Sequence, residues 1–199
     1  TARCIFEYIY FARPDSRIDG MGVYESRVNA GRILAKTHPV EADLVVGVPE
    51  SGNPAALGYS MESAIPYGNA FIKNNYVGRT FIKPKQEQRE SSVKVKLNVL
   101  KEEVAGKRVV MIDDSIVRGT TSRRIVNLLR QAGAKEVHVR ISSPAFLHPC
   151  YFGTDIPSED QLVASGRTVD EICKYIEADS LGYLETDKLG EMAAELLLG

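Results

Sequence analysis

The stretch from Val109 to Ser122 constrains the fold more than any other part of the chain. Its first four residues, Val109–Ile112, are apolar without alternation, which is typical of a strand buried on both faces. Asp113 and Asp114 follow directly, and after a short polar segment apolar residues return at helical spacing from Ile125. The stretch therefore predicts a buried strand, a polar loop and a helix.

The start of the predicted helix lacks the acid that usually complements its N–H groups and partial positive charge. Ser122, Arg123 and Arg124 stand there, and Gly119 permits close backbone approach just before them. An external anion, most plausibly a phosphate, is the natural complement. Since parallel strands and the helices after them meet at one edge of a sheet, we expect the ligand at that edge.

The acids of this loop, Asp113 and Asp114, would repel a phosphate unless they face something else. Sugar hydroxyls and a divalent cation are suitable partners for carboxylates. A sugar phosphate bound with a metal satisfies both halves of the loop. The alternative is an ordinary strand, turn and helix with solvated acids.

The rest of the chain repeats the order of strand and helix. Further strands are expected at 43–48 and 137–141, and helices at 24–37, 55–59, 97–105 and 125–132. This alternation predicts an α/β fold with a doubly wound parallel sheet. Residues 1–153 are expected to form the core and 154–199 a helical tail or hood, in which Thr168 and Glu171 suit a capping box. The apolar end at 196–198 predicts that the natural protein continues.

Composition excludes several classes of protein. The chain has 199 residues, enough for one packed domain, and its formal net charge of −1 gives no reason to expect a nucleic acid or a membrane as partner. It contains no apolar run of the roughly 20 residues that span a bilayer, and no export signal is visible at its start. Three widely spaced cysteines argue against a disulfide framework, so a reducing cytoplasm is expected.

Three motifs in order carry a resemblance to a known family. They are 109–122, the sequence Tyr-Phe-Ala-Arg-Pro-Asp-Ser at 10–16, and Tyr-Val-Gly-Arg-Thr-Phe-Ile at 76–82. The first resembles the ribose-phosphate signature of the type I phosphoribosyltransferases. Together the three are similar to the amidophosphoribosyltransferase branch of that family, from about Cys4 to the end of the chain.

The resemblance implies an enzyme, a pentosyltransferase of purine biosynthesis. It would transfer ammonia, derived from glutamine in the full-length enzyme, to C1 of phosphoribosyl pyrophosphate, giving 5-phosphoribosylamine and pyrophosphate. Such a reaction needs positioning, charge neutralisation and exclusion of water more than acid–base chemistry. Asp113 and Asp114 would hold the ribose hydroxyls and Mg²⁺. The 5-phosphate would be held by the loop after them, namely Ser115, Arg118, Gly119, Thr120, Thr121 and Ser122.

A second loop joins a strand to a helix at Pro49, Glu50, Ser51, Gly52 and Asn53. Taken alone it is a weak anion-loop signal, but in the family the matching loop grips the pyrophosphate. Several relatives have a second serine there that helps to hold magnesium, whereas this chain has Gly52. Ser51 or water is expected to supply that metal contact instead.

A polar, basic segment at 74–96 is expected to be a flexible loop that closes over a polyanion, with a solvated surface loop as the alternative. The family has such a loop at this place. Arg79 and Lys83 are the expected contacts, and Asn75 stands where the family normally has an arginine.

The cysteines have separate expected roles. In one branch of the family four cysteines bind an iron–sulfur cluster, and Cys4 and Cys150 match two of these positions. Two thiolates cannot hold a four-iron cluster, so we expect a [4Fe-4S] cluster in the full-length parent and none in this chain. Cys173 matches no ligand. Cys4 does not match the nucleophile of the family's glutaminase, whose domain and activity should be absent here.

Two other functions remain open from the sequence. A salvage phosphoribosyltransferase would act on a nucleobase and need a stacking aromatic in the hood. A regulator that senses phosphoribosyl pyrophosphate would bind it without turnover. The family also implies a homo-oligomer in the full-length enzyme and purine nucleotides as feedback inhibitors.

Overall fold

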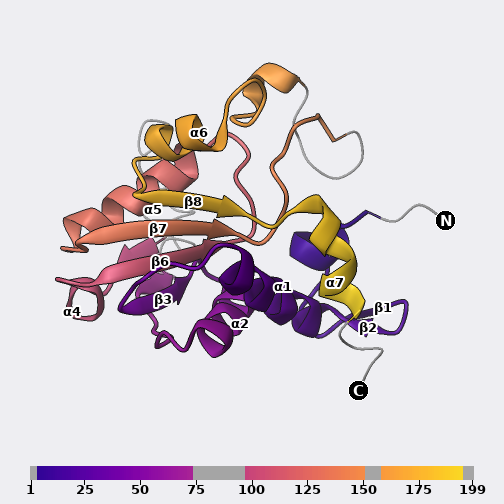
Figure 1. Cartoon of the computed structure of the whole chain (residues 1–199), viewed down its shortest axis with the longest axis horizontal. Helices are drawn as coiled ribbons and strands as arrows, with labels where there is room; N and C mark the ends of the chain where they lie inside the picture. Colours follow the sequence, from indigo (N-terminus) through magenta and orange to yellow (C-terminus); the bar gives the residue numbers. More distant parts are fainter. Residues whose placement is uncertain (1–3, 74–96, 151–157, 195–199) are drawn as a thin grey trace, which may run out of the picture.

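A four-stranded parallel sheet forms the centre of the protein (Figure 1). The structure is a computed structural model and describes residues 4–73, 97–150 and 158–194. The strands lie in the order β3-β6-β7-β8, and their bounds are β3 Leu44–Gly47, β6 Arg108–Asp113, β7 Glu136–Ile141 and β8 Ser180–Tyr183.

Strand β6 occupies an interior position between β3 and β7. Val109 and Met111 pack on one face of the sheet, and Val110 and Ile112 pack on the other. Burial on both faces explains why the strand is continuously apolar, and it confirms the prediction for this stretch.

Helices cover both faces of the sheet (Figure 1). Side chains of α1 (Val23–Thr37), α2 (Asn53–Ser63) and α7 (Leu189–Ala194) pack on one face. Those of α4 (Lys101–Val104), α5 (Thr120–Gln131) and α6 (Val169–Tyr175) pack on the other. The predicted doubly wound α/β fold is therefore confirmed. Within the described ranges, no helix is both long and apolar enough to cross a membrane.

The crossing of α1 and α2 depends on two glycines. A Cβ at Gly31 would lie 1.8 Å from the carbonyl oxygen of Ala55, and one at Gly58 would lie 1.9 Å from that of Val28. Only glycine allows backbones to approach so closely. The contact fixes α1 against the helix that follows the β3 loop.

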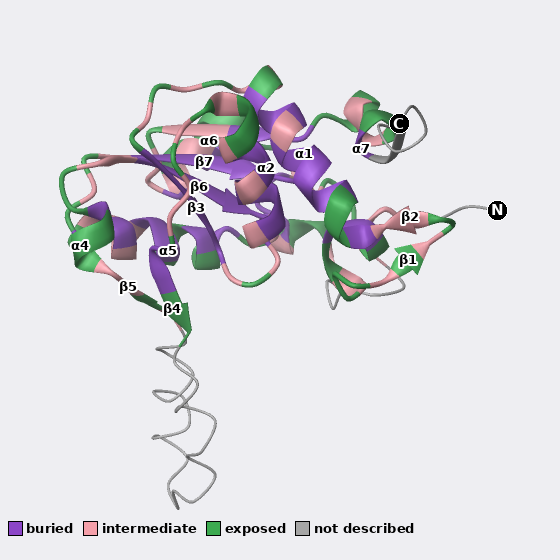
Figure 2. Cartoon of the chain, turned by 90° about the horizontal axis from the view of Figure 1, so that it is seen from below, coloured by how far each residue is buried: buried purple, intermediate pink, exposed green. Residues whose placement is uncertain are grey.

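The smaller elements differ in part from the expectations. Residues 97–105 were predicted as one helix, but they form β5 (Leu97–Val99), which pairs antiparallel with β4 (Phe71–Lys73), followed by α4 (Figure 2). The aromatic segment near the start is a single π-helical turn, η1 (Glu7–Phe11), which leads into a hairpin of β1 (Arg17–Ile18) and β2 (Met21–Gly22).

The tail of the chain is not helical throughout. It contains the short helices η3 (Glu159–Gln161), α6 and η4 (Thr186–Lys188). Strand β8 lies between α6 and η4 in the sequence and joins the sheet beside β7. The expectation of a purely helical tail was wrong here, because Ser180–Tyr183 is short and contains Gly182 and so gives little strand signal. The predicted capping box is present: Thr168 accepts from the backbone N–H of Glu171, whose carboxylate accepts from that of Thr168.

Tyr183, the last residue of β8, has a buried hydroxyl that finds no hydrogen-bond partner among the described residues. Burial raises the pKa of this phenol to about 12. Tyr59 is also buried, but its hydroxyl donates to the carbonyl oxygen of His38 at 3.0 Å.

Replacing Tyr183 by phenylalanine should raise the free energy of unfolding by about 1 kcal/mol, because an unsatisfied buried hydroxyl costs stability. Urea denaturation measures the change. Tyr59→Phe is the matched control and should lower stability by about 1 kcal/mol, since it removes a hydroxyl that makes its bond. Equal losses in the two variants would contradict the prediction.

Candidate functional site

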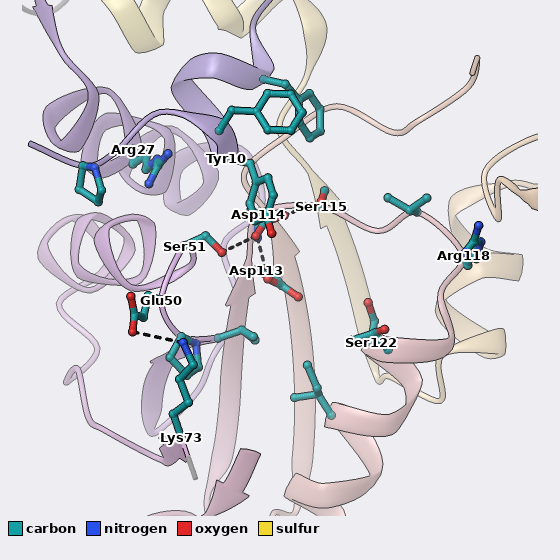
Figure 3. A pocket seen from close by; sticks show the side chains of 18 of the residues that line it. Tyr10, Arg27, Glu50, Ser51, Lys73, Asp113, Asp114, Ser115, Arg118 and Ser122 are labelled. Carbon is teal, nitrogen blue, oxygen red and sulfur yellow. Dashed lines mark hydrogen bonds and ion pairs between the residues drawn. The ribbon is translucent and has the colours of Figure 1, made fainter. Parts of the chain in front are cut away.

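A cleft of about 900 Å³ lies at the carboxyl edge of the sheet. Its floor is the end of β6, and its walls come from residues 6–14, from the loop after β3 and from the loop that leads into α5 (Figure 3). The predicted position of the ligand site at this edge therefore coincides with a cavity.

Asp113 and Asp114 lie at the centre of the cleft and are 7% and 8% exposed. The backbone N–H of Asp114 donates to Oδ1 of Asp113 at 2.9 Å. The two carboxylate oxygens of Asp114 accept hydrogen bonds from the hydroxyls of Ser51 and Ser115. Ser51 thus connects the loop after β3 to the acids at the end of β6.

The surroundings of Asp113 disfavour its charged form. Burial, and then the negative charge of Asp114, raise the pKa of Asp113 well above its ordinary value of 3.8, against a smaller lowering by the hydrogen bond from the Asp114 backbone. No salt bridge to either acid exists within the described ranges. Arg27, which lines the same cleft, interacts with the charge of Asp114 but forms no salt bridge with it. The pair is therefore suited to accept a further cation together with hydroxyl groups.

The amino end of α5 faces the same cleft. Gly119 precedes the helix with φ of 77°. No side chain caps the amino end of α5, and the first turn of the helix contains no acid. A Cβ at Gly119 would lie 2.8 Å from the ring of Tyr175, so the position requires glycine for both reasons. Thr120, Thr121 and Ser122 line the cleft, and their N–H groups belong to the turn that has no partners within the helix. This end of the helix can bind an anion.

The loop after β3 contributes part of what was expected. Pro49, Glu50 and Ser51 line the cleft, whereas Gly52 and Asn53 do not. Gly52 is buried, and a Cβ there would lie 2.5 Å from the carbonyl oxygen of Ile112 on β6. The glycine thus allows the loop to pack directly against the strand that carries the acids.

One predicted residue, Arg118, has another partner, and two others lie outside the described part of the chain. Arg118 lines the cleft, and its guanidinium donates to the side chain of Gln161 at 2.6 Å. Arg79 and Lys83 fall in the undescribed range 74–96. Cys4 is exposed, Cys150 and Cys173 are partly buried, and none forms a disulfide.

One wall of the cleft was not predicted from the sequence. Phe6, Tyr10 and Phe11 line it from η1 and its start. Figure 3 shows Tyr10 on the side of the cleft away from Arg118 and Ser122. Arg27 of α1 lies on the same side, is 4% exposed, and has a pKa that burial lowers and the charge of Asp114 raises. Its position on the stripe formed by Val23, Ala30 and Leu34 was the available signal, since a cation on a buried helix face is unusual.

Lys73 was also missed. It lies at the end of β4, lines the cleft, and its Nζ is 3.4 Å from a carboxylate oxygen of Glu50. Both side chains are largely exposed, so the ion pair contributes little to stability. It places one cation and one anion beside the loop after β3.

Comparison with known proteins identifies the family to which this fold belongs. Residues 26–142 match the phosphoribosyl transferase domain, and the chain belongs to this family. The chain is similar to curated amidophosphoribosyltransferases, with 58% identity to that of Archaeoglobus fulgidus over 96% of this chain and 55% to that of Bacillus subtilis over 94%. These matches confirm the predicted resemblance. The chain spans about two fifths of the length of these relatives, 42% and 39%.

A solved structure gives the same result. The glutamine phosphoribosylpyrophosphate amidotransferase of Bacillus subtilis, complexed with ADP and GMP, superposes on 95% of this chain with a TM-score of 0.85 and 54% identity. The match covers 42% of that chain.

The raised pKa of Asp113 gives the ligand-free protein a defined pH dependence. The folded protein holds this proton more tightly than the unfolded chain, so stability should fall as the pH rises from about 3.8 through the folded pKa. Asp113→Asn keeps an oxygen for the Asp114 N–H and should be more stable than the wild type at neutral pH, with the difference vanishing below that window. Urea denaturation from pH 3 to 8 in a metal chelator measures this.

Asp43 provides a control of opposite sign. Hydrogen bonds from Arg108 lower the pKa of Asp43 to about 2, so its contribution is present above 3.8 and is lost as the pH falls through 2. Asp43→Asn should therefore be less stable than the wild type at neutral pH. If Asp113→Asn is also less stable than the wild type at neutral pH, the raised pKa of Asp113 is contradicted.

Proposed function

We propose that this chain transfers ammonia to C1 of phosphoribosyl pyrophosphate, releasing pyrophosphate and forming 5-phosphoribosylamine. One observation carries the proposal: two buried acids, which form no salt bridge within the described ranges, stand in the same cleft as the uncapped amino end of α5. The relatives are named amidophosphoribosyltransferases, which supports ammonia as the group that receives the phosphoribosyl unit.

In this proposal each loop has a part. Asp113 and Asp114 hold the ribose hydroxyls, and the backbone and hydroxyls of 118–122 hold the 5-phosphate. The loop 49–53 holds the pyrophosphate next to Lys73, and Arg79 and Lys83 contribute from 74–96. The first interactions place C1, and the second set neutralises charge on the leaving group.

Magnesium fits the donor set that the cleft offers. Mg²⁺ in phosphate sites binds one or two carboxylates together with water and substrate oxygens, so a group of three protein ligands is not needed. Asp113 and Asp114 would supply the carboxylates. Because the Ser51 hydroxyl donates to Asp114, its part in holding the metal would be to orient that acid. The ion would neutralise the departing pyrophosphate.

The remaining expectations concern the longer protein. Because the relatives are more than twice as long, we propose that a glutaminase domain supplies the nitrogen there. From the resemblance to the family we also propose that the protein is a cytoplasmic homo-oligomer. Cys4 and Cys150 would belong to its iron–sulfur site. The complex of the Bacillus subtilis relative with ADP and GMP supports purine nucleotides as regulators of this chain's family. We also propose that residues 1–153 form most of the core, while 154–199 supplies the hood and, in addition, strand β8 of the central sheet.

Pyrophosphate release by the purified chain tests the function. With phosphoribosyl pyrophosphate and Mg²⁺, release should require ammonium, and should not respond to glutamine or to nucleobases. Release with a nucleobase alone would indicate a salvage enzyme instead. Binding without release under any condition would indicate a sensor.

Asp113→Asn combined with Asp114→Asn should abolish the rise in melting temperature that phosphoribosyl pyrophosphate and Mg²⁺ cause, because both the sugar and the metal lose their ligands. The melting temperature measured with and without ligand gives the answer. Asp187→Asn, an exposed acid outside the cleft, is the control and should keep the rise. A double variant that keeps it would remove the acids from the site.

A further inference from the structure

Arg27 is a buried cation that pairs with backbone instead of with an acid. Its Nε donates to the carbonyl oxygen of Tyr8 at 2.7 Å, and one Nη donates to that of Ala12 at 2.9 Å. No carboxylate within the described ranges forms a salt bridge with it. A guanidinium stays charged when buried, so this side chain must be held there by what it contacts.

The two carbonyls that Arg27 binds lie near the two ends of η1. Tyr8 and Ile9 of this turn are buried, and the Tyr8 hydroxyl donates to the carbonyl oxygen of Ile18 at 3.3 Å. The planar fork of Arg27 holds both carbonyls at once through separate Nε and Nη donors in a fixed geometry, which the single flexible ammonium group of a lysine does not reproduce. Arg27 thus fixes how the turn faces the cleft.

The turn presents an aromatic wall to the cleft, made of Phe6, Tyr10 and Phe11. The ring of Phe11 lies 5.9 Å from that of Phe6 and 5.8 Å from that of Tyr10, and Phe6 also contacts Phe146 at 4.7 Å. Figure 3 shows Tyr10 and Arg27 together on the side of the cleft opposite Ser122. An apolar wall at this place can keep water away from the sugar.

Exclusion of water matters for the reaction proposed above. If water attacks C1 instead of ammonia, the bond from C1 to the pyrophosphate oxygen breaks and its electron pair leaves with pyrophosphate. The water oxygen then bonds to C1, its proton passes to solvent, and ribose 5-phosphate results. A site that positions ammonia must therefore also limit this hydrolysis.

We propose that Arg27 is a positioning residue that holds the aromatic wall against the cleft and so favours ammonia over water at C1. The proposal rests on the proposed function and adds a residue that controls its outcome. Arg27 acts through Tyr10 and its neighbours, without touching the reacting atoms.

The test compares Arg27→Lys, which keeps the charge and loses the fork, with Arg32→Lys on the same helix. Pyrophosphate release from phosphoribosyl pyrophosphate and Mg²⁺ without ammonium measures hydrolysis, and the increment with ammonium measures amination. Arg27→Lys should raise the ratio of hydrolysis to amination roughly tenfold. The shift in melting temperature caused by the substrate should stay as in the wild type, and Arg32→Lys should change neither quantity.

Tyr10→Ala keeps the test valid if Arg27→Lys does not fold, because Tyr10 is 54% exposed and its loss should spare the fold. It should raise the same ratio, and adding Arg27→Lys to it should change the ratio little further, as expected when one residue acts through the other. An unchanged ratio in Tyr10→Ala, or in a folded Arg27→Lys, would overturn the proposal.

Chymotrypsin cleavage after Tyr10 or Phe11 measures how firmly Arg27 holds η1, and this measurement does not depend on enzymatic turnover. Under native conditions Arg27→Lys should be cleaved there faster than the wild type and Arg32→Lys. Equal cleavage rates would overturn the claim that Arg27 holds η1 in place. If the wild type releases no pyrophosphate with ammonium, the proposed function fails, and the cleavage rates still decide whether Arg27 holds the turn.

Discussion

The close placement of two buried carboxylates and the amino end of α5 is the constraint on which the cleft depends. Burial and mutual repulsion make the ionised pair unfavourable, and the raised pKa of Asp113 expresses this cost. The uncapped end of α5 has the opposite need, because its N–H groups and partial charge attract an anion. A ligand that brings hydroxyls and a cation to the acids and a phosphate to the helix meets both needs at once. Phosphoribosyl pyrophosphate with Mg²⁺ is such a ligand in the proposed function.

The sheet holds these groups in place. β6 lies between β3 and β7, so its carboxyl end cannot move without disturbing both neighbours. Gly52 lets the loop after β3 lie against the end of β6, and Ser51 binds Asp114 from that loop. Contacts between two loops far apart in sequence therefore orient the acids.

Much of the site could be predicted because it is local in sequence. Val109–Ser122 contains the strand, the acids and the helix start within one stretch, and the three motifs identified the family. Arg27 could not be assigned a role, because its partners Tyr8 and Ala12 come from a turn whose position tertiary packing decides. β8 was missed since it forms by pairing with β7, and the helix predicted at 97–105 gave way to the pairing of Leu97–Val99 with β4. Packing overrode local propensity in these places.

A crystal structure of the chain with phosphoribosyl pyrophosphate and Mn²⁺ in place of Mg²⁺ tests the central claim most directly, because anomalous scattering locates the metal. The account predicts the 5-phosphate within hydrogen-bond distance of the N–H groups of 120–122, and the ribose hydroxyls and the metal beside Asp113 and Asp114. A phosphate bound away from the amino end of α5, or acids that contact neither sugar nor metal, would contradict it.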